Sequence, residues 1–186
     1  MNLNRVKTNN SFLFIKQEFR KEYIKNLKCK NVLDAYCGES EIWKIIKTDS
    51  YLGIDENLTN DINLKGDNRK YLGILDLSKF NIIDLDAYGI PFNQLKLIFE
   101  NKTLKQGTIV FFTFIQSFFG IMPHSLLQLY GYRKKMIKKI PTLFFRKGFK
   151  IFKWYLATRG IKKIEYIKVK NKIYGMFEVD KKEKIE

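Results

Sequence analysis

Five aspartates in the first half of this 186-residue chain stand where a ligand could use them. Each one ends or closely follows a short segment rich in apolar residues: Asp34, Asp55, Asp67, Asp84 and Asp86. An ionised carboxylate has two oxygens that accept hydrogen bonds from paired hydroxyls or from an amino group. Ligands of open parallel sheets bind beyond the carboxyl ends of the strands, so these residues predict one ligand site at that edge.

Apolar runs that alternate with helix-like segments would position these aspartates. We expect strands within residues 31–38, 51–55, 62–65, 80–85, 107–115, 161–169 and 172–179. We expect helices at residues 11–27, 39–47, 71–77, 92–101, 124–140 and 142–159. This alternation predicts an α/β fold with a mostly parallel sheet and helices on both faces. Only the Lys170-Asn171 turn separates the last two strands, which therefore form an antiparallel hairpin.

The length fits one domain over residues 1–186. Within it we expect an N-terminal helix in 1–28, a cofactor-binding core over 29–115, basic helices over 121–160, a hairpin over 161–180 and a tail at 181–186. Two cysteines, Cys29 and Cys37, and one histidine, His124, do not have the spacing of metal ligands. We therefore expect no metal site.

The loop after the first strand argues against two common nucleotide folds. Residues 34–40 contain one glycine, Gly38, whereas dinucleotide binding calls for Gly-x-Gly-x-x-Gly at this place. No glycine-rich loop that ends in Lys-Ser or Lys-Thr occurs elsewhere in the chain. A nicotinamide-dependent dehydrogenase and a P-loop nucleotidase are thereby disfavoured.

The run Val32-Leu-Asp-Ala-Tyr-Cys-Gly38 resembles the first motif of the class I S-adenosylmethionine-dependent methyltransferases. The resemblance implies a Rossmann-like methyltransferase fold, with a seven-stranded sheet, and S-adenosyl-L-methionine as the cofactor. It also implies that Asp34 orients the loop and the cofactor's amino group, and that Gly38 lets the backbone pass under the methionine part. Asp55 would accept both ribose hydroxyls, and Asp67 with Asn68 would meet the adenine amino group.

A second stretch, Asn81-Ile-Ile-Asp-Leu-Asp-Ala-Tyr-Gly-Ile-Pro91, is similar to the Asp-x-Asp-Pro-Phe-Gly-Ser-Pro element of tRNA guanine dimethyltransferases. It is related more loosely to the Asp-Pro-Pro-Tyr element of DNA amino-methyltransferases. The likeness implies methyl transfer to an exocyclic amino nitrogen of a base in RNA or DNA. Asp86 would accept the amine hydrogens, and Tyr88 would stack on the base. Asp84 is a further catalytic candidate. The alternative for both Asp84 and Asp86 is a structural role as caps of the next helix, at residues 92–101.

The chain departs from both patterns, and the departures keep other functions open. Ser40 stands where the first motif has a second glycine, and Ala87 replaces a proline of the later motif. The likeness covers about residues 30–115, and the substrate domain of the tRNA enzymes has no counterpart. A non-catalytic nucleic-acid-binding protein of the same fold, or a methyltransferase for a small molecule or a protein, are the alternatives.

Positive charge is concentrated in the last third of the chain. The net charge is +16, and residues 121–186 hold 18 Lys and Arg against 5 Asp and Glu. Such asymmetry indicates a polyanionic partner. We expect nucleic acid to bind at a basic cluster that follows the fifth strand: Arg133, Lys134, Lys135, Lys138 and Lys139. Solvated lysines on an amphipathic helix, or a helix on a membrane surface, are the alternatives.

No segment predicts insertion into a membrane. Residues 1–10 are polar, unlike a signal peptide, and the longest apolar stretch, at 108–122, has about 15 residues. A spanning helix needs about 20. We therefore expect a cytoplasmic protein.

Overall fold

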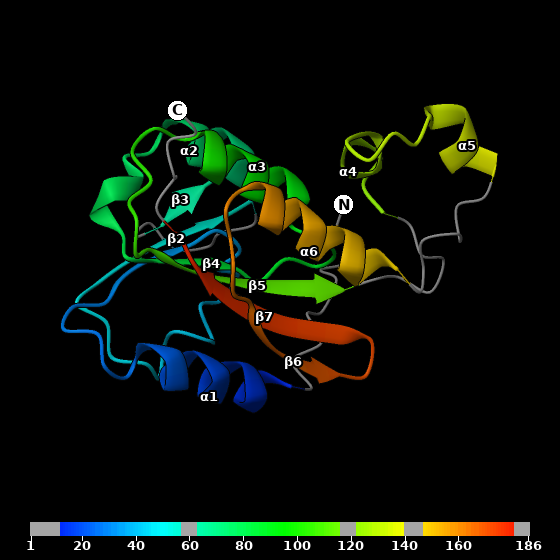
Figure 1. Ribbon diagram of the computed structural model, residues 1–186. Coiled ribbons are helices and arrows are strands. Elements are labelled where there is room, and N and C mark those ends of the chain that lie inside the picture. Colours follow the sequence, from blue (N-terminus) through cyan, green and yellow to red (C-terminus); the bar gives the residue numbers. More distant parts are fainter. Residues whose placement is uncertain (1–11, 57–62, 116–121, 140–146, 181–186) are drawn as a thin grey trace, which may run out of the picture.

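A seven-stranded sheet forms the centre of the computed structural model, which describes residues 12–56, 63–115, 122–139 and 147–180 (Figure 1). The strand order is β3-β2-β1-β4-β5-β7-β6. Pairing is parallel from β3 to β5, and β7 is antiparallel to both β5 and β6. The strands are β1 (Asn31–Asp34), β2 (Ser50–Asp55), β3 (Leu64–Lys65), β4 (Ile82–Leu85), β5 (Ile109–Ile115), β6 (Glu165–Val169) and β7 (Lys172–Glu178). The predicted α/β class and C-terminal hairpin are confirmed.

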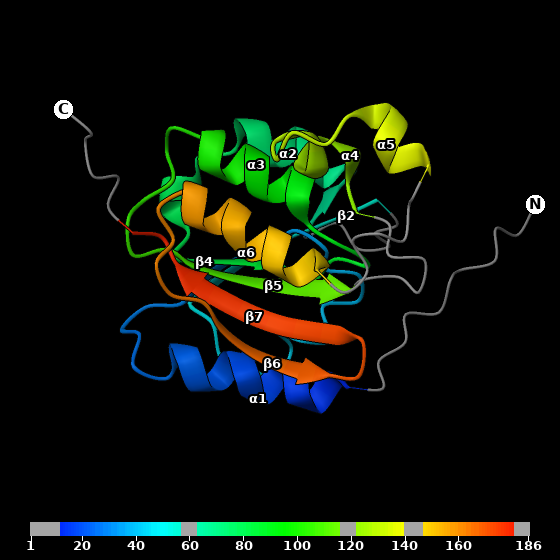
Figure 2. The same ribbon diagram turned by 45° about the vertical axis from the view of Figure 1, so that its right-hand side comes forward.

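Helices cover both faces of the sheet. α2, α3 and α6 lie on one face and α1 lies on the other (Figures 1 and 2). The short helices α4 and α5 project beyond the edge at which β5 ends. The helices are α1 (Leu13–Ile24), α2 (Asn68–Ile74), α3 (Phe92–Glu100), α4 (His124–Gln128), α5 (Lys134–Lys139) and α6 (Gly148–Thr158), with a 3-10 turn, η1 (Leu77–Lys79). In the part of the chain that the structure describes, no helix has the length and apolar character needed to cross a bilayer.

Two apolar layers hold this arrangement together. Successive side chains of a strand point to opposite faces, so β5, which is apolar along almost its whole length, contributes to both layers. Phe112 and Phe114 pack toward the α2–α3–α6 face, and Phe111 packs toward α1, Phe19 and Trp43. Burial on both faces explains why the strand reads as a continuous apolar run.

Three predicted elements differ from those observed. Residues 39–47 form turns, not a helix. Of the apolar residues expected to face inward, Ile42, Trp43 and Ile46 are buried, whereas Ile45 is 55% exposed. Ser40 has a φ of 59°, a left-handed value that a right-handed helix cannot include. The predicted helix at 124–140 is divided into α4 and α5 by Gly131, whose φ is 79°. The third strand, predicted within residues 62–65, is observed as the two residues Leu64–Lys65.

Parts of four predictions lie outside the described residues: residue 11 of the first helix, residue 62 of the third strand, residue 140 and residues 142–146 of the basic helices, and the tail at 181–186.

Candidate cofactor pocket and reaction site

The aspartates singled out in the sequence gather at the carboxyl edge of three adjacent strands. Asp34 ends β1, Asp55 ends β2, and Asp84 lies in β4 directly beside Asp34. Asp86 follows β4 by one residue. In the sheet, β2 and β3 lie on one side of β1, and β4 and β5 lie on its other side. This reversal between β1 and β4 is where open α/β sheets bind ligands.

A pocket of about 340 Å³ opens at this edge. Its size falls within the range of small-molecule sites. Three of the predicted cofactor residues line it, namely Asp55, Asp67 and Asn68, whereas Asp34 and Gly38 do not. The complete lining is Ala35, Tyr36, Asp55, Glu56, Gly66, Asp67, Asn68, Arg69, Asn93 and Gln94.

Hydrogen bonds fix the loops around the pocket. The Gly38 amide donates to Asp55 Oδ2 at 3.0 Å, which ties the loop after β1 to the end of β2. Asn68 Nδ2 donates to the carbonyl of Ala35 at 2.7 Å, and its Oδ1 accepts from Gln94 at 3.0 Å. These bonds join three loops that arrive from separate strands. Gln94 was not recognised in the sequence, because nothing in its own segment marks it as a partner of Asn68.

Asp67 has a structural role besides its place in the pocket wall. Its carboxylate caps α2 by accepting from the Arg69 amide at 2.9 Å, and it pairs with the Arg69 side chain at 2.6 Å. The Arg69 bonds lower the pKa of Asp67, so this carboxyl stays ionised. An acid at this position is a charged acceptor at the mouth of the pocket.

Asp34 is 2% exposed and does not line the pocket, but it bonds to the backbone of Tyr36, which does. It accepts from the Tyr36 amide at 3.2 Å and lies 3.1 Å from the Tyr51 hydroxyl. Burial raises the pKa of Asp34 well above its ordinary value, and the nearby charge of Asp84 adds to the shift. The Tyr51 hydroxyl also lies 2.9 Å from Ser40 Oγ. This contact accommodates a serine at a left-handed position where the resembling motif has glycine.

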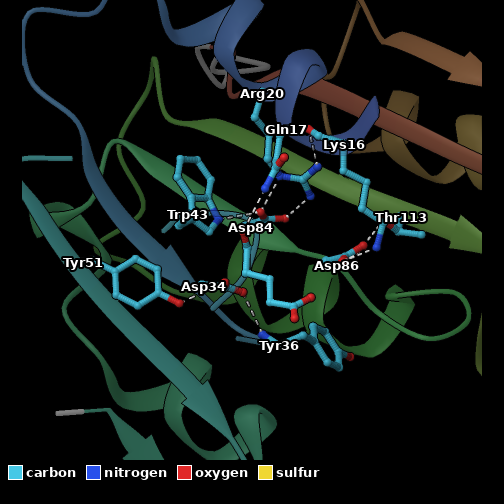
Figure 3. Close-up of polar contacts among 11 residues, drawn as sticks. Lys16, Gln17, Arg20, Asp34, Tyr36, Trp43, Tyr51, Asp84, Asp86 and Thr113 are labelled. Atoms are coloured by element: carbon cyan, nitrogen blue, oxygen red, sulfur yellow. Dashed lines mark hydrogen bonds and ion pairs between the residues drawn. The ribbon is translucent and has the colours of Figure 1, made fainter. Parts of the chain in front are cut away.

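Asp84 is fully buried between two partners from other parts of the chain (Figure 3). Arg20 of α1 donates hydrogen bonds to both carboxylate oxygens of Asp84, at 2.6 Å and 2.7 Å, and Trp43 Nε1 donates a third at 2.8 Å. Burial would lower the pKa of Arg20, but the charge of Asp84 reverses this and raises it. A carboxylate enclosed in this way fits a structural role, although it does not cap α3, whose first turn has no side-chain cap.

Asp86 is held by Lys16 of α1 and Thr113 of β5 (Figure 3). Lys16 Nζ lies 2.5 Å from Oδ2, and the Thr113 hydroxyl donates to Oδ1. Burial alone would raise the pKa of Asp86, but the charges of Lys16 and Arg20 outweigh it and leave the pKa below its ordinary value. Two residues further along, Tyr88 is 85% exposed. The pair thus combines an ionised acceptor with a free aromatic ring.

The α1 partners of these acids were missed in the sequence. The helix was expected to bury an apolar stripe, yet Lys16 and Arg20 are buried beside Phe19. Their spacing of four residues puts them on one helical face, which is the signal that could have found them. A pair of cations on the buried face of a helix needs buried acids opposite.

The predicted nucleic-acid-binding residues lie in or next to α5. Arg133 precedes this helix, and the lysines Lys134, Lys135, Lys138 and Lys139 belong to it. All five side chains are exposed. α5 projects past the edge at which β5 ends (Figures 1 and 2). The pocket residue Asp55 ends β2 at the same carboxyl edge, because β2, β1, β4 and β5 are parallel.

Solved structures of similar architecture were found, whereas neither protein-family models nor curated sequences gave a match. A proposed methylase from Haemophilus influenzae aligns over 90% of this chain and 98% of its own, with 10% identity and a TM-score of 0.52. A proposed methyltransferase from Escherichia coli aligns over 95% and 89%, with 8% identity and a TM-score of 0.54. The chain has the class I methyltransferase fold.

A third structure of this methyltransferase fold is a proposed S-adenosyl-L-methionine-dependent methyltransferase from Methanococcus maripaludis. It aligns over 95% of this chain and 91% of its own, with 17% identity and a TM-score of 0.51. At sequence identities this low, the structural likeness shows the fold but does not identify the substrate. The function must therefore be argued from the site.

Proposed function

We propose that the protein is a cytoplasmic S-adenosylmethionine-dependent methyltransferase that acts on an exocyclic amino nitrogen of a base in RNA or DNA. One observation carries the proposal. A pocket walled by Asp55, Asp67 and Asn68 opens at the switch point of the sheet, and the ionised Asp86 directly follows β4. Tyr36, which follows β1, also lines the pocket, so the cofactor site and the acceptor lie next to the paired strands β1 and β4.

The pocket residues suit the chemical groups of the cofactor. Asp55 offers a carboxylate at the end of β2 for two ribose hydroxyls, and Asp67 and Asn68 offer acceptors for an adenine amino group. Gly38 has a φ of 49°, and a Cβ added there would meet no atom within 4 Å. Space beside this backbone is therefore open to a ligand. S-adenosylmethionine would supply an electrophilic methyl group on a sulfonium sulfur.

Asp86 would act on the amine that receives the methyl group. An exocyclic amine becomes positively charged as it forms the new N–C bond, and a nearby carboxylate stabilises that charge. A carboxylate has about four lone-pair sites. Lys16 and Thr113 occupy two of them, so capacity remains for the amine hydrogens. The exposed ring of Tyr88 would stack on the base.

The second candidate is a non-catalytic nucleic-acid-binding protein of the same fold. The observation that favours it is the engagement of both Asp86 oxygens by Lys16 and Thr113. The two candidates differ in turnover but share the basic surface at α5.

Transfer of an isotope-labelled methyl group to tRNA, rRNA and genomic DNA tests the proposal. Mass spectrometry of the nucleosides then identifies the base. We expect label in the wild type and at least about a hundredfold less in Asp86→Ala, since the lost interaction acts at the reacting amine. Glu18→Gln, which alters an exposed carboxyl of α1, is the matched control. Cofactor binding without any transfer would favour the non-catalytic candidate, and no binding at millimolar cofactor would refute both the cofactor and the reaction.

The α5 cluster is tested by salt dependence. Replacing Arg133, Lys134 and Lys135 by Ala should flatten the salt dependence of nucleic-acid binding by about two to three phosphate contacts and leave cofactor binding unchanged. The control changes three basic residues in or directly after α1, a helix far along the chain from α5: Lys21, Lys25 and Lys28. An equal loss in this control would contradict a local role of the cluster.

A further inference from the structure

Large aromatic side chains gather on the outer surface of α6 and its neighbours. Trp154 of α6 is 47% exposed, and its ring centroid lies 5.9 Å from that of Tyr130, which follows α4. Phe149, at the start of α6, meets Tyr166 of β6 at 5.0 Å, and Tyr166 is 45% exposed. We call Tyr130, Phe149, Trp154 and Tyr166 the aromatic face. Two of its rings thus present a large surface to solvent.

Lysines stand over these rings. Lys150 Nζ lies 5.2 Å from the centre of the Trp154 ring. Lys153 Nζ lies 5.5 Å from the centre of Phe149 and 5.7 Å from that of Tyr166. Each exposed ring therefore has a cation beside it, so a flat group that stacks on the ring places an attached anion within reach of a lysine.

No acidic residue neutralises this region in the sequence. Between Glu100 and Glu165 the chain contains no Asp and no Glu. On α1, by comparison, Lys21 pairs with Glu18 at 2.8 Å and Lys25 pairs with Glu22 at 2.6 Å. By contrast, the lysines in the described parts of α5 and α6 make no ion pair. Their charge is left for an anionic partner.

The start of α6 and the loop of the proposed reaction site are both attached to the end of β5. Phe149 packs on Phe114, next to the last residue of β5, with ring centroids 5.2 Å apart. That last residue, Ile115, donates its amide to the carbonyl of Gly89 at 2.7 Å. Gly89 directly follows Tyr88. The end of β5 thus holds both Phe149 and the loop that carries Asp86 and Tyr88.

We propose that the aromatic face binds a single-stranded segment of nucleic acid, with bases stacked on Trp154 and Tyr166 and phosphates at Lys150 and Lys153. This inference rests on the nucleic-acid substrate of the proposed function and adds that the bound segment is unpaired. In a duplex both faces of each base are covered by its neighbours, so only unpaired bases can stack on a side chain. Proteins that bind single strands combine cations along the backbone with aromatic platforms in this way.

A membrane surface fits α6 less well. A helix that lies on a bilayer buries its apolar face among the lipids. The apolar face of α6, formed by Ile151, Phe152, Tyr155 and Leu156, is already buried in the core. What α6 leaves outside is an alternation of rings and cations, which matches the alternation of bases and phosphates.

Fluorescence anisotropy with labelled oligonucleotides of about 12 residues, RNA and DNA, each single-stranded and as the matching duplex, tests the inference. Trp154→Ala and Tyr166→Ala should each weaken single-strand binding at least about fivefold. Neither should change duplex binding. Trp154→Phe, which keeps a ring, should retain most of the affinity and guards against misfolding of the alanine variant. The control is Phe14→Ala, which removes a 71% exposed ring from α1 on the other side of the sheet.

Two results of the anisotropy measurements would overturn the inference: single-strand affinity unchanged in both alanine variants, or an equal loss in Phe14→Ala. Binding to anionic vesicles together with no affinity for oligonucleotides would overturn it in favour of a membrane. Its failure is separable from that of the proposed function. If both alanine variants still transfer the methyl group and still bind nucleic acid with wild-type affinity, only the role of the aromatic face is refuted. Ring-dependent single-strand binding without any methyl transfer refutes the reaction alone.

Discussion

Removal of Arg20 is the sharpest test of how α1 is attached to the sheet. Arg20 is 1% exposed, its partner Asp84 is completely buried, and the two are joined by bonds of 2.6 Å and 2.7 Å. Arg20→Met keeps an unbranched apolar side chain in the same space but leaves the Asp84 carboxylate without its counter-charge. Among the residues that the structure describes, the Trp43 indole N–H alone would still bond to that carboxylate.

The expected loss is about 3–5 kcal/mol in the free energy of unfolding, since breaking one side of a buried ion pair leaves an uncompensated charge. For a chain of this length that corresponds to a fall in Tm of roughly 6–20 °C. The exposed ion pair between Lys21 and Glu18 is the reference with which this loss of stability is compared. Lys21→Met should cost no more than about 1 kcal/mol, since solvent screens an exposed pair.

Urea unfolding followed by circular dichroism measures both variants. Adding Asp84→Asn to Arg20→Met should recover a large part of the loss, because the buried charge is then gone and the amide oxygen still accepts from Trp43. A cost below about 1 kcal/mol for Arg20→Met would refute the reasoning, as would a double variant no more stable than the single one.

Three further outcomes are expected. Asp55→Ala should weaken S-adenosylmethionine or S-adenosylhomocysteine binding by about 1.5–3 kcal/mol in calorimetry, the usual contribution of charged hydrogen bonds, and unchanged affinity would contradict its ribose role. Because folding lowers the pKa of Asp86, its contribution is present above the unfolded value of about 3.9 and is lost as pH falls through the folded value. Asp86→Asn should therefore lose less stability on acidification than the wild type, in urea titrations across pH 2–6. Gly175→Ala should cost about 1–3 kcal/mol because its Cβ would strike the Phe112 ring, whereas Gly73→Ala, with nothing near its Cβ, should be neutral or stabilising by up to about 1 kcal/mol.

Local patterns were sufficient for the class of fold and for the edge that holds the site. The acids at the ends of apolar runs predicted that Asp34, Asp55 and Asp84 would meet at one edge, because parallel strands bring their carboxyl ends together. The motif likeness added Asp67 and Asn68, and both line the pocket beside Asp55. These features depend on short stretches of chain, and a short stretch is what a sequence pattern describes.

The tertiary structure decided which of these acids are exposed and what neutralises the others. Asp34 ends β1 and Asp84 lies one residue before the end of β4. Both are buried, and Asp84 receives its charge partner from 64 residues away. That pairing depends on how α1 packs under the sheet, and no local periodicity encodes it. The insertion of β7 between β5 and β6 is of the same kind, since a hairpin pattern does not say which of its strands pairs with the sheet. The sequence by itself determined which groups are present, namely the acids and the hairpin strands. Long-range packing determined which residues pair with them.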